Sequence, residues 1–218
     1  MSSKEKNLKK GLFITFEGVE GAGKTTNIKY IAEQIQKKGI DILLTREPGG
    51  TDIGEAIREI LISKDFPEMH YITELLLMFA ARSEHINKKI IPALEKGTWV
   101  LCDRFTDASY AYQGAGRGVD KKNIKLLENM VQDKLQPDYT FLFDLEAKTG
   151  LSRARQRGET DRFEQQHIDF FNRVRMEYLN MASSDIQRYK IINAQYDIET
   201  VRSQISDILN KIINQNND

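Results

Sequence analysis

The sequence carries at residues 18–25 the stretch Gly18-Val19-Glu20-Gly21-Ala22-Gly23-Lys24-Thr25, which matches the pattern G-x-x-x-x-G-K-[ST]. This stretch follows a short apolar run, Leu12 to Phe16, and leads into a segment with the period of an amphipathic helix. A strand, a glycine-rich turn and a helix in this order form the context in which the pattern builds a phosphate-binding loop, or P-loop. A glycine-rich turn without a ligand is the alternative, but it does not explain why all three features coincide.

The residue types in this loop suit a nucleoside triphosphate. Glycines let backbone N–H groups converge on a phosphate, and the helix N-terminus adds the positive end of its dipole. We expect Gly18 to Thr25 to bind ATP, with Lys24 directed at the β- and γ-phosphates and the Thr25 hydroxyl on Mg²⁺. The sequence contains no N-K-x-D guanine motif, which argues against a GTPase.

Short β-rich runs alternate with longer helical segments along the chain, an order typical of an α/β fold whose parallel sheet is covered by helices. A long helical region is predicted from about Tyr71 to Lys96, with a kink or break at Pro92. Its apolar part, Leu75 to Ala81, is either core or a partner face. The predicted strands are Leu12 to Phe16, Ile40 to Thr45, Thr98 to Cys102, Tyr139 to Asp144 and Tyr189 to Ile192.

Composition limits the class of protein. The 218 residues suit one domain, expected over residues 11–213 after a flexible tail at 1–10. Lys plus Arg equals Asp plus Glu at 32 each, so there is no overall basic field for a nucleic-acid polymer. A single cysteine, Cys102, excludes an internal disulfide and suits a reducing cytoplasm. No apolar run approaches the ~20 residues of a membrane span, so a soluble cytoplasmic protein is expected.

Three further segments stand where a second substrate would bind. Residues 45–51 (TREPGGT) follow the second predicted strand, residues 103–105 (DRF) follow the third, and residues 109–114 (SYAYQG) come shortly afterwards. Ligands of parallel α/β sheets bind beyond the carboxyl ends of the strands, so these loops should face the P-loop. Asp103 is either a helix cap or the carboxylate that holds Mg²⁺ through water.

Residues 153–162 (RARQRGETDR) contain four arginines. Such a run is usually a solvated helix face, but opposite a P-loop it indicates a lid that closes on ATP. The variable positions of the P-loop contain no arginine, so the positive charge that meets the transferring phosphoryl group must come from elsewhere. Arg153 and Arg157 are four residues apart and share a helical face. We expect Arg157 to be catalytic, with Arg153 as its helper and Arg162 as the next choice.

Taken together, GVEGAGKTT, TREPGGT, DRF…AYQG and RARQRGETDR, in this order and spacing, resemble the bacterial thymidylate kinase family over roughly residues 11 to 210. The P-loop is shared by many families, whereas TREPGGT and DRF…AYQ are specific to this one. The resemblance implies a homodimeric enzyme with a three-layer P-loop kinase fold, a five-stranded parallel sheet and a lid at about residues 153–165. It also implies transfer of the γ-phosphoryl group of ATP to dTMP, with Mg²⁺, to form dTDP and ADP.

The resemblance further implies roles for charged residues. Arg58 and Arg104 would grip the dTMP phosphate, a dianion suited to planar guanidinium groups. Arg82 would donate to O4 of thymine, which disfavours cytosine. Glu20 would accept a hydrogen bond from the sugar 3′-hydroxyl. Without the resemblance, Arg58 could be a solvated helix charge and Glu20 could cap the P-loop helix.

Polar and aromatic residues would complete the dTMP site. Tyr112 would crowd the sugar 2′ position and so select deoxyribose, because a ribose hydroxyl would clash or lie buried without a partner. Tyr112 could instead be half of an ordinary surface pair. Ser109 and Gln113 would line the base edge. The family usually has a phenylalanine stacked on thymine four residues before Arg82; here that position is Met78, and Phe79 follows it. Either Met78 covers the base, or a local shift of the helix brings Phe79 there.

Two other functions remain open from the sequence. The first is a different nucleotide or deoxynucleoside kinase on the same fold, against which the phosphate-binding pair Arg58 and Arg104 argues. The second is a regulator that senses ATP without transferring phosphate, which would not need Lys24 or the lid arginines. A coupled assay of ADP production with and without dTMP separates these readings.

Overall fold

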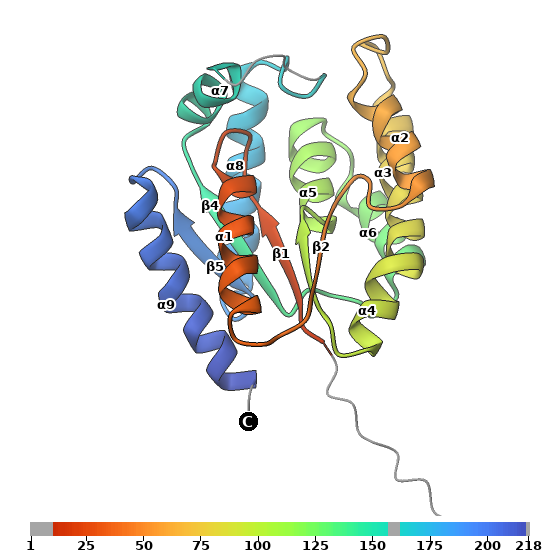
Figure 1. Cartoon of the computed structure of the whole chain (residues 1–218). Coiled ribbons are helices and arrows are strands. Elements are labelled where there is room, and N and C mark those ends of the chain that lie inside the picture. Colours follow the sequence, from red (N-terminus) through yellow and green to blue (C-terminus); the bar gives the residue numbers. More distant parts are fainter. Residues whose placement is uncertain (1–10, 157–161, 217–218) are drawn as a thin grey trace, which may run out of the picture.

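Five parallel strands form the centre of the molecule in a computed structural model that describes residues 11–156 and 162–216. The strand order is β2-β3-β1-β4-β5, so the strand before the P-loop lies in the middle of the sheet (Figure 1). Because all strands run in the same direction, their carboxyl ends meet at one edge. The strands are β1 (Phe13–Glu17), β2 (Ile42–Arg46), β3 (Trp99–Asp103), β4 (Tyr139–Asp144) and β5 (Tyr189–Asn193).

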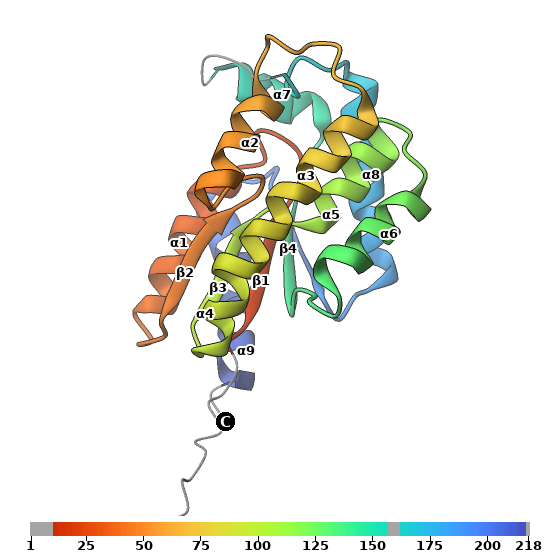
Figure 2. The same ribbon diagram turned by 90° about the vertical axis from the view of Figure 1, so that its right-hand side faces the viewer.

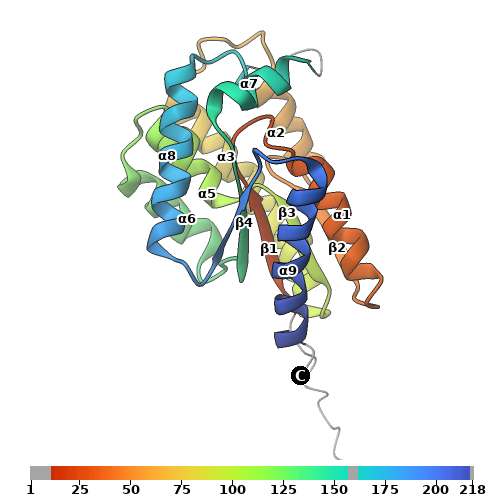
Figure 3. The same cartoon turned by 90° about the vertical axis from the view of Figure 1, so that its left-hand side faces the viewer.

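Helices cover both faces of this sheet, which gives three layers. Figure 3 shows α1 and α9 on one side of the strands and α3, α5, α6 and α8 on the other. Among the residues that the structure describes, no helix is long and apolar enough to cross a membrane. The helices are α1 (Lys24–Gln36), α2 (Asp52–Ile62), α3 (Tyr71–His85), α4 (Ile91–Glu95), α5 (Thr106–Ser109), α6 (Lys121–Gln132), α7 (Ala147–Gln156), α8 (Ile168–Ser184) and α9 (Ile198–Asn216), with π-helical segments η1 (Ile86–Ile90) and η2 (Tyr110–Gly116).

The predicted α/β fold is confirmed, and each of the five predicted strands forms with its ends shifted by two residues or fewer. Successive side chains of β1 point to opposite faces of the sheet, so this strand contributes to the core on both faces. Ile14 and Phe16 belong to the core cluster that includes Ile28 and Ile31 of α1. Phe13 belongs to a separate cluster with residues of β3, η1 and α4. Both faces of β1 are therefore buried, as expected for a central parallel strand, although Thr15 and Glu17, on the same face as Phe13, are polar.

The long helical region predicted from Tyr71 to Lys96 forms as the continuous series α3, η1 and α4. Pro92 lies in the first turn of α4, and the π-helical segment precedes it. Proline has no N–H group and its ring crowds the carbonyl four residues earlier, so a widened turn before it relieves that conflict. Leu75 and Phe79 are buried, whereas Leu76 is 52% exposed, so this stretch is core on one side only.

Candidate active site

The P-loop lies between β1 and α1, at the carboxyl edge of the sheet. Gly21 shows why the loop needs glycine: its φ is 71°, and a Cβ there would lie 2.0 Å from the carbonyl oxygen of Gly150 in α7. Gly23, at the N-cap of α1, has φ 81°. Both are left-handed conformations that glycine adopts without strain. The loop therefore closes tightly over the N-terminus of α1, where a phosphate would meet N–H groups.

Lys24 is the first residue of α1 and is held inside the loop. Its Nζ donates hydrogen bonds to the carbonyl oxygens of Gly18 and Val19, at 2.9 and 3.1 Å. Burial, with a smaller contribution from the nearby Arg104 cation, lowers the pKa of Lys24 to about 8. Carbonyl oxygens do not neutralise an ammonium group, so this buried cation would gain from an anionic ligand.

Two cavities meet beside this loop. The first, which we call the phosphate cavity, contains residues 20–25 of the P-loop together with Asp103 and Glu164. The second, which we call the acceptor cavity, lies between α2, α3, the α5–η2 segment and Phe163. The four residues that line both cavities are Glu20, Glu47, Arg58 and Arg104. Two arginines thus stand at the junction, where a group moving from one cavity to the other would pass.

The acceptor cavity collects eight of the nine residues that the sequence assigned to dTMP. Residues from five separate segments come together here because the strand ends and the helices packed beyond them share one edge of the sheet. The eight residues are Glu20, Arg58, Met78, Arg82, Arg104, Ser109, Tyr112 and Gln113.

Glu20, Arg104 and Tyr112 form a hydrogen-bonded group at the junction. Arg104 Nη2 donates to Glu20 Oε1 at 2.9 Å, and the Tyr112 hydroxyl donates to both carboxylate oxygens at 2.8 and 2.7 Å. The Arg104 guanidinium also lies over the Tyr112 ring, 4.7 Å from its centroid. Burial raises the pKa of Tyr112 well above its usual value, so its hydroxyl stays protonated and remains a donor. The alternative in which Tyr112 is half of a surface pair does not fit its 5% exposure.

Arg82 forms the floor of the acceptor cavity and is 2% exposed. Its Nε donates to Glu47 Oε2 at 2.7 Å, while its two terminal nitrogens donate to Ser109 Oγ at 3.2 Å and to the Phe105 carbonyl at 3.1 Å. A guanidinium has five N–H groups, and three of them are used by these bonds. The remaining two can serve an acceptor on a ligand.

The family of the chain follows from its comparison with known proteins. A family model described as "Thymidylate kinase" matches residues 16–205. The chain belongs to the thymidylate kinase family. A thymidylate kinase of Pseudomonas savastanoi pv. phaseolicola is 50% identical over 203 residues, which cover 93% of this chain and 97% of that protein. A thymidylate kinase of Ruthia magnifica is 50% identical over 202 residues, with 93% and 98% covered.

A solved structure supports the same family. The crystal structure of thymidylate kinase from Ehrlichia chaffeensis matches with a TM-score of 0.74 and 32% identity, over 92% of this chain and 99% of that one. The fold predicted from the sequence, a five-stranded parallel P-loop kinase fold, is thus confirmed both by the strand order and by this likeness. The chain is an enzyme of this family, whose activity is phosphorylation of dTMP.

The side chains of Met78 and Phe79 have different surroundings in this member of the thymidylate kinase family. Met78 lines the acceptor cavity, whereas Phe79 is buried in a cluster with Leu75, Val119 and Ile124. One helical position is a rotation of about 100°, which turns the two side chains to different sides of α3. We therefore correct the assignment of Phe79: it is a core residue that also lies under the Arg82 guanidinium, with 4.5 Å from Arg82 Cζ to the ring centroid.

The arginine-rich segment divides among different surroundings. Arg157 lies outside the described residues. Arg153, in α7, is exposed and its Nη1 donates to the Ala194 carbonyl at 3.1 Å. Arg162 is 3% exposed; its Nη1 lies 2.8 Å from Glu74 Oε2, and its Nε donates to the Leu61 carbonyl. Neither Arg153 nor Arg162 lines the phosphate cavity. Arg162, our next choice for the transition-state charge, is instead held in a buried ion pair.

A Mg²⁺ site is supported by Asp103, at the end of β3. Asp103 lines the phosphate cavity together with Thr25, and its Oδ1 is buried with no hydrogen-bond partner among the described residues. A buried carboxylate oxygen without a donor is costly unless a cation or water meets it. Carboxylate, hydroxyl and water are the ligands that Mg²⁺ prefers, so this pair fits the metal.

Several residues of the site were missed in the sequence. Glu47 and Pro48 were inside the quoted TREPGGT motif, yet only the structure shows that they line the acceptor cavity. Phe163 lines it too, although it follows the lid arginines directly. Tyr178 accepts a hydrogen bond from Arg104, and Glu17 accepts one from the N–H of Phe105; both are more than 70 residues from Arg104, so no local pattern could have indicated them.

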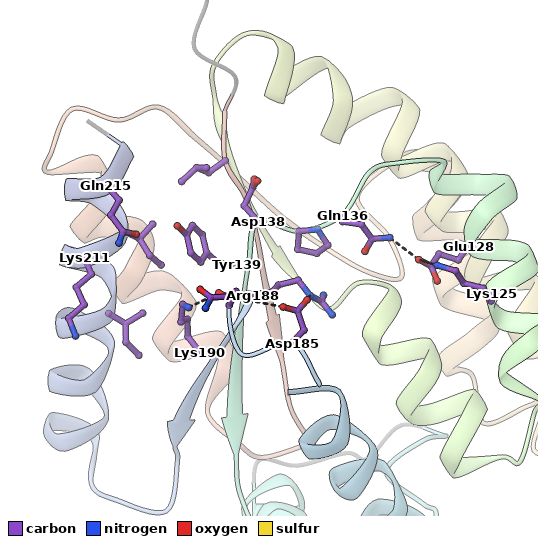
Figure 4. Close-up of a pocket in the computed structure, with 15 residues that line it drawn as sticks. Lys125, Glu128, Gln136, Asp138, Tyr139, Asp185, Arg188, Lys190, Lys211 and Gln215 are labelled. Atoms are coloured by element: carbon purple, nitrogen blue, oxygen red, sulfur yellow. Dashed lines mark hydrogen bonds and ion pairs between the residues drawn. The ribbon is translucent and has the colours of Figure 1, made fainter. Parts of the chain in front are cut away.

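A separate cavity of about 970 Å³ lies at the opposite end of the sheet, where the strands begin (Figure 4). It is lined by residues such as Asp138 and Tyr139 at the start of β4, Lys190 of β5 and Lys211 of α9. Its arginine, Arg188, is already paired with Asp107 at 2.7 Å and Asp185 at 3.2 Å. This cavity is remote from the P-loop, so the chemistry belongs to the smaller cavities at the carboxyl edge.

Proposed function

We propose that the enzyme transfers the γ-phosphoryl group of ATP, held in the phosphate cavity, to the phosphate of dTMP, held in the acceptor cavity. The observation that carries this proposal is that both cavities share Arg58 and Arg104. Two phosphate groups must approach each other during transfer, and their charges repel. Guanidinium groups between them offset this repulsion and fix the distance between the reacting groups.

The donor phosphates would be held by the P-loop and Lys24. The backbone N–H groups and the Lys24 ammonium meet charge that grows on the phosphates during transfer. Mg²⁺, when bound through Thr25 and through water on Asp103, would neutralise the β- and γ-oxygens. Arg157, with Arg153 as its helper, stays our prediction for the charge that closes over the transferring group.

Recognition of thymidylate would rest on Arg82, Tyr112 and Glu20. An N–H of Arg82 left over from its protein contacts would donate to O4 of thymine, while Met78, Ser109 and Gln113 would surround the base. Glu20 would accept a hydrogen bond from the 3′-hydroxyl of the sugar. Tyr112, fixed by two hydrogen bonds to Glu20, would leave no room for a 2′-hydroxyl. A buried hydroxyl without a partner costs about 1–3 kcal/mol, which favours deoxyribose.

We also propose a homodimer, formed through the outer face of α2, α3 and α6. These three helices lie side by side on the face that Figure 2 turns to the viewer. Each carries large apolar side chains that are exposed in one chain, and gathered apolar surface of this kind marks interaction sites. These side chains are Ile53 and Ile60 of α2, Leu76 of α3, and Leu126 and Met130 of α6.

The cytoplasm is the compartment we propose. It supplies ATP, and its reducing conditions suit the only cysteine of the sequence, Cys102, which is a buried free thiol in β3.

A coupled assay of ADP formation tests the proposed reaction. We expect turnover with dTMP and Mg²⁺, a kcat/KM for dCMP and for ribose TMP lower by about 10²-fold or more, and no turnover with thymidine. Equal kcat/KM for dTMP and dCMP would support a different nucleotide kinase, and turnover of thymidine would support a nucleoside kinase. ADP formation that does not depend on an added nucleotide would refute transfer to an acceptor.

A further inference from the structure

Arg104 has a backbone conformation that an arginine rarely adopts. Its φ is 68°, in the left-handed region, and the only other non-glycine residue with positive φ in the described ranges 11–156 and 162–216 is Asp133. This conformation costs free energy for a residue with a Cβ, so surrounding contacts must hold it. Since the proposed function places Arg104 on the acceptor phosphate, what holds it bears on substrate binding.

Glu17 holds the backbone at Arg104. The N–H of Phe105, the next residue, donates to Glu17 Oε1 at 2.7 Å, and the Arg104 N–H donates to the Phe16 carbonyl at 3.0 Å. Both acceptors belong to the end of β1. β1, the strand that leads into the P-loop, therefore fixes the backbone turn that carries Arg104.

Tyr178 of α8 links the same carboxylate to the side chain. Its hydroxyl donates to Glu17 Oε2 at 2.6 Å, and Arg104 Nη1 donates to the Tyr178 hydroxyl oxygen at 3.3 Å. The opposite end of the guanidinium donates to Glu20. The carboxyl group of Glu17 is thus linked to Arg104 by two routes, through the following peptide and through the Tyr178 hydroxyl.

This arrangement is costly as core packing. Glu17 is fully buried and Tyr178 is 1% exposed. Burial, with the nearby Asp107 adding to it, raises the pKa of Glu17 to about 8 against the opposing effect of Arg104. Apolar side chains of similar size would fill the space at lower cost. A buried polar network that is satisfied in this way fixes the position of its members, here an arginine at the junction of the two cavities.

We propose that Glu17 and Tyr178 are positioning residues that hold Arg104 in the geometry that binds the acceptor phosphate. Neither residue lines the acceptor cavity or the phosphate cavity. The inference rests on the proposed role of Arg104, and it goes beyond that role because it predicts an effect on dTMP that is produced from the far side of the arginine.

Tyr178→Phe tests the inference, because it removes only the hydroxyl that joins Glu17 to Arg104. We expect the KM for dTMP to rise about 10-fold and kcat to fall as well, because Arg104 also lies at the junction of the two cavities, with the KM for ATP within about 2-fold of wild type. Tyr110→Phe is the matched control: the Tyr110 hydroxyl also donates to a glutamate at 2.6 Å, Glu128 Oε2, but does not contact Arg104. A wild-type KM for dTMP in Tyr178→Phe, or an equal rise in Tyr110→Phe, overturns the proposal.

A double-mutant cycle separates positioning from general weakening of the fold. Once Arg104→Ala has removed the arginine, adding Tyr178→Phe should change the KM for dTMP by less than about 2-fold. Independent, additive effects of the two substitutions would overturn the positioning role while leaving Arg104 on the phosphate. An Arg104→Ala variant with a normal KM for dTMP would instead refute the proposed role of Arg104, and positioning through it would fall as well.

Discussion

Replacing Arg82 by alanine is expected to reduce folding stability as well as dTMP recognition. The Arg82 guanidinium is 2% exposed and is paired with Glu47, which is 4% exposed. It also donates to Ser109 and to the Phe105 carbonyl, and it lies over the Phe79 ring. Truncation would leave a buried carboxylate and two further acceptors without this donor.

The size of the loss follows from these contacts. Removing one partner of a buried ion pair costs about 3–5 kcal/mol, because the other charge stays buried and uncompensated. His85 Nδ1 lies 3.0 Å from the other oxygen of Glu47 and remains in place, so we expect about 3 kcal/mol. Against a typical unfolding free energy of 5–15 kcal/mol, such a variant would keep its fold with a narrow margin.

Urea denaturation of the two proteins measures this loss directly. Arg173→Ala is the matched control, since Arg173 donates to the carbonyls of Ala115 and Gly116 at the surface; it should cost less than about 1 kcal/mol. The double variant Arg82→Met with Glu47→Gln should have an unfolding free energy about 1–2 kcal/mol higher than that of Arg82→Ala, because no unpaired charge is left. Its preference for dTMP over dCMP should be as low as that of Arg82→Ala. An Arg82→Ala protein within about 1 kcal/mol of wild type would refute this reasoning.

Three other predictions follow from the site and its surroundings. Lys24→Met should lower kcat by about 10²-fold or more with an unchanged circular dichroism spectrum, because it removes the charge aimed at the donor phosphates; near-normal turnover would contradict the P-loop assignment. The folded-state pKa of Glu17, about 8, lies above its ordinary value of 4.5, so Glu17 binds a proton more tightly in the folded protein, and the unfolding free energy should fall as the pH rises from about 4.5 to 8. Glu17→Gln should flatten that slope in urea titrations, and a slope equal to wild type would contradict the shifted pKa. Leu76→Arg should convert the proposed dimer to monomer in light scattering, and an unchanged mass would exclude the α2–α3–α6 face.

The parts of the molecule that the sequence predicted are those governed by local rules. The P-loop was predictable because its glycines, its lysine and the helix after it are contiguous. The strands were predictable because central parallel strands are short runs rich in β-branched and aromatic residues, such as β1 and β4. Strand ends shifted by up to two residues, since backbone hydrogen bonds to neighbouring strands, and not side-chain type, decide where a strand stops.

Contacts between distant segments were not predictable by the same rules. The Met78 and Phe79 positions are both apolar and adjacent, and only the packing of α3 on Val119 and Ile124 decides which one faces the acceptor cavity. The predicted strand ended at Phe16, one residue before Glu17. No local pattern indicated the partners of Glu17, since Phe105 and Tyr178 lie 88 and 161 residues away from it. Such contacts are visible only in the folded structure, where residues far apart in the sequence meet.

Arg153 and Arg162 show how chemically equal side chains of one segment meet different surroundings. Arg162 is fixed by Glu74, a fully buried carboxylate on α3 that also accepts hydrogen bonds from Gln113 and Arg117. Because Gln113 lines the acceptor cavity, Arg162 is tied to the wall of that cavity, and it does not line the phosphate cavity. The helical-face argument concerned Arg153 and Arg157, and it stays a prediction because Arg157 lies outside the described residues. Arg82 and Arg104 likewise have protein partners as well as a place on the acceptor cavity that we propose binds dTMP, so their contributions to stability and to binding separate only when a buried partner is changed together with the arginine.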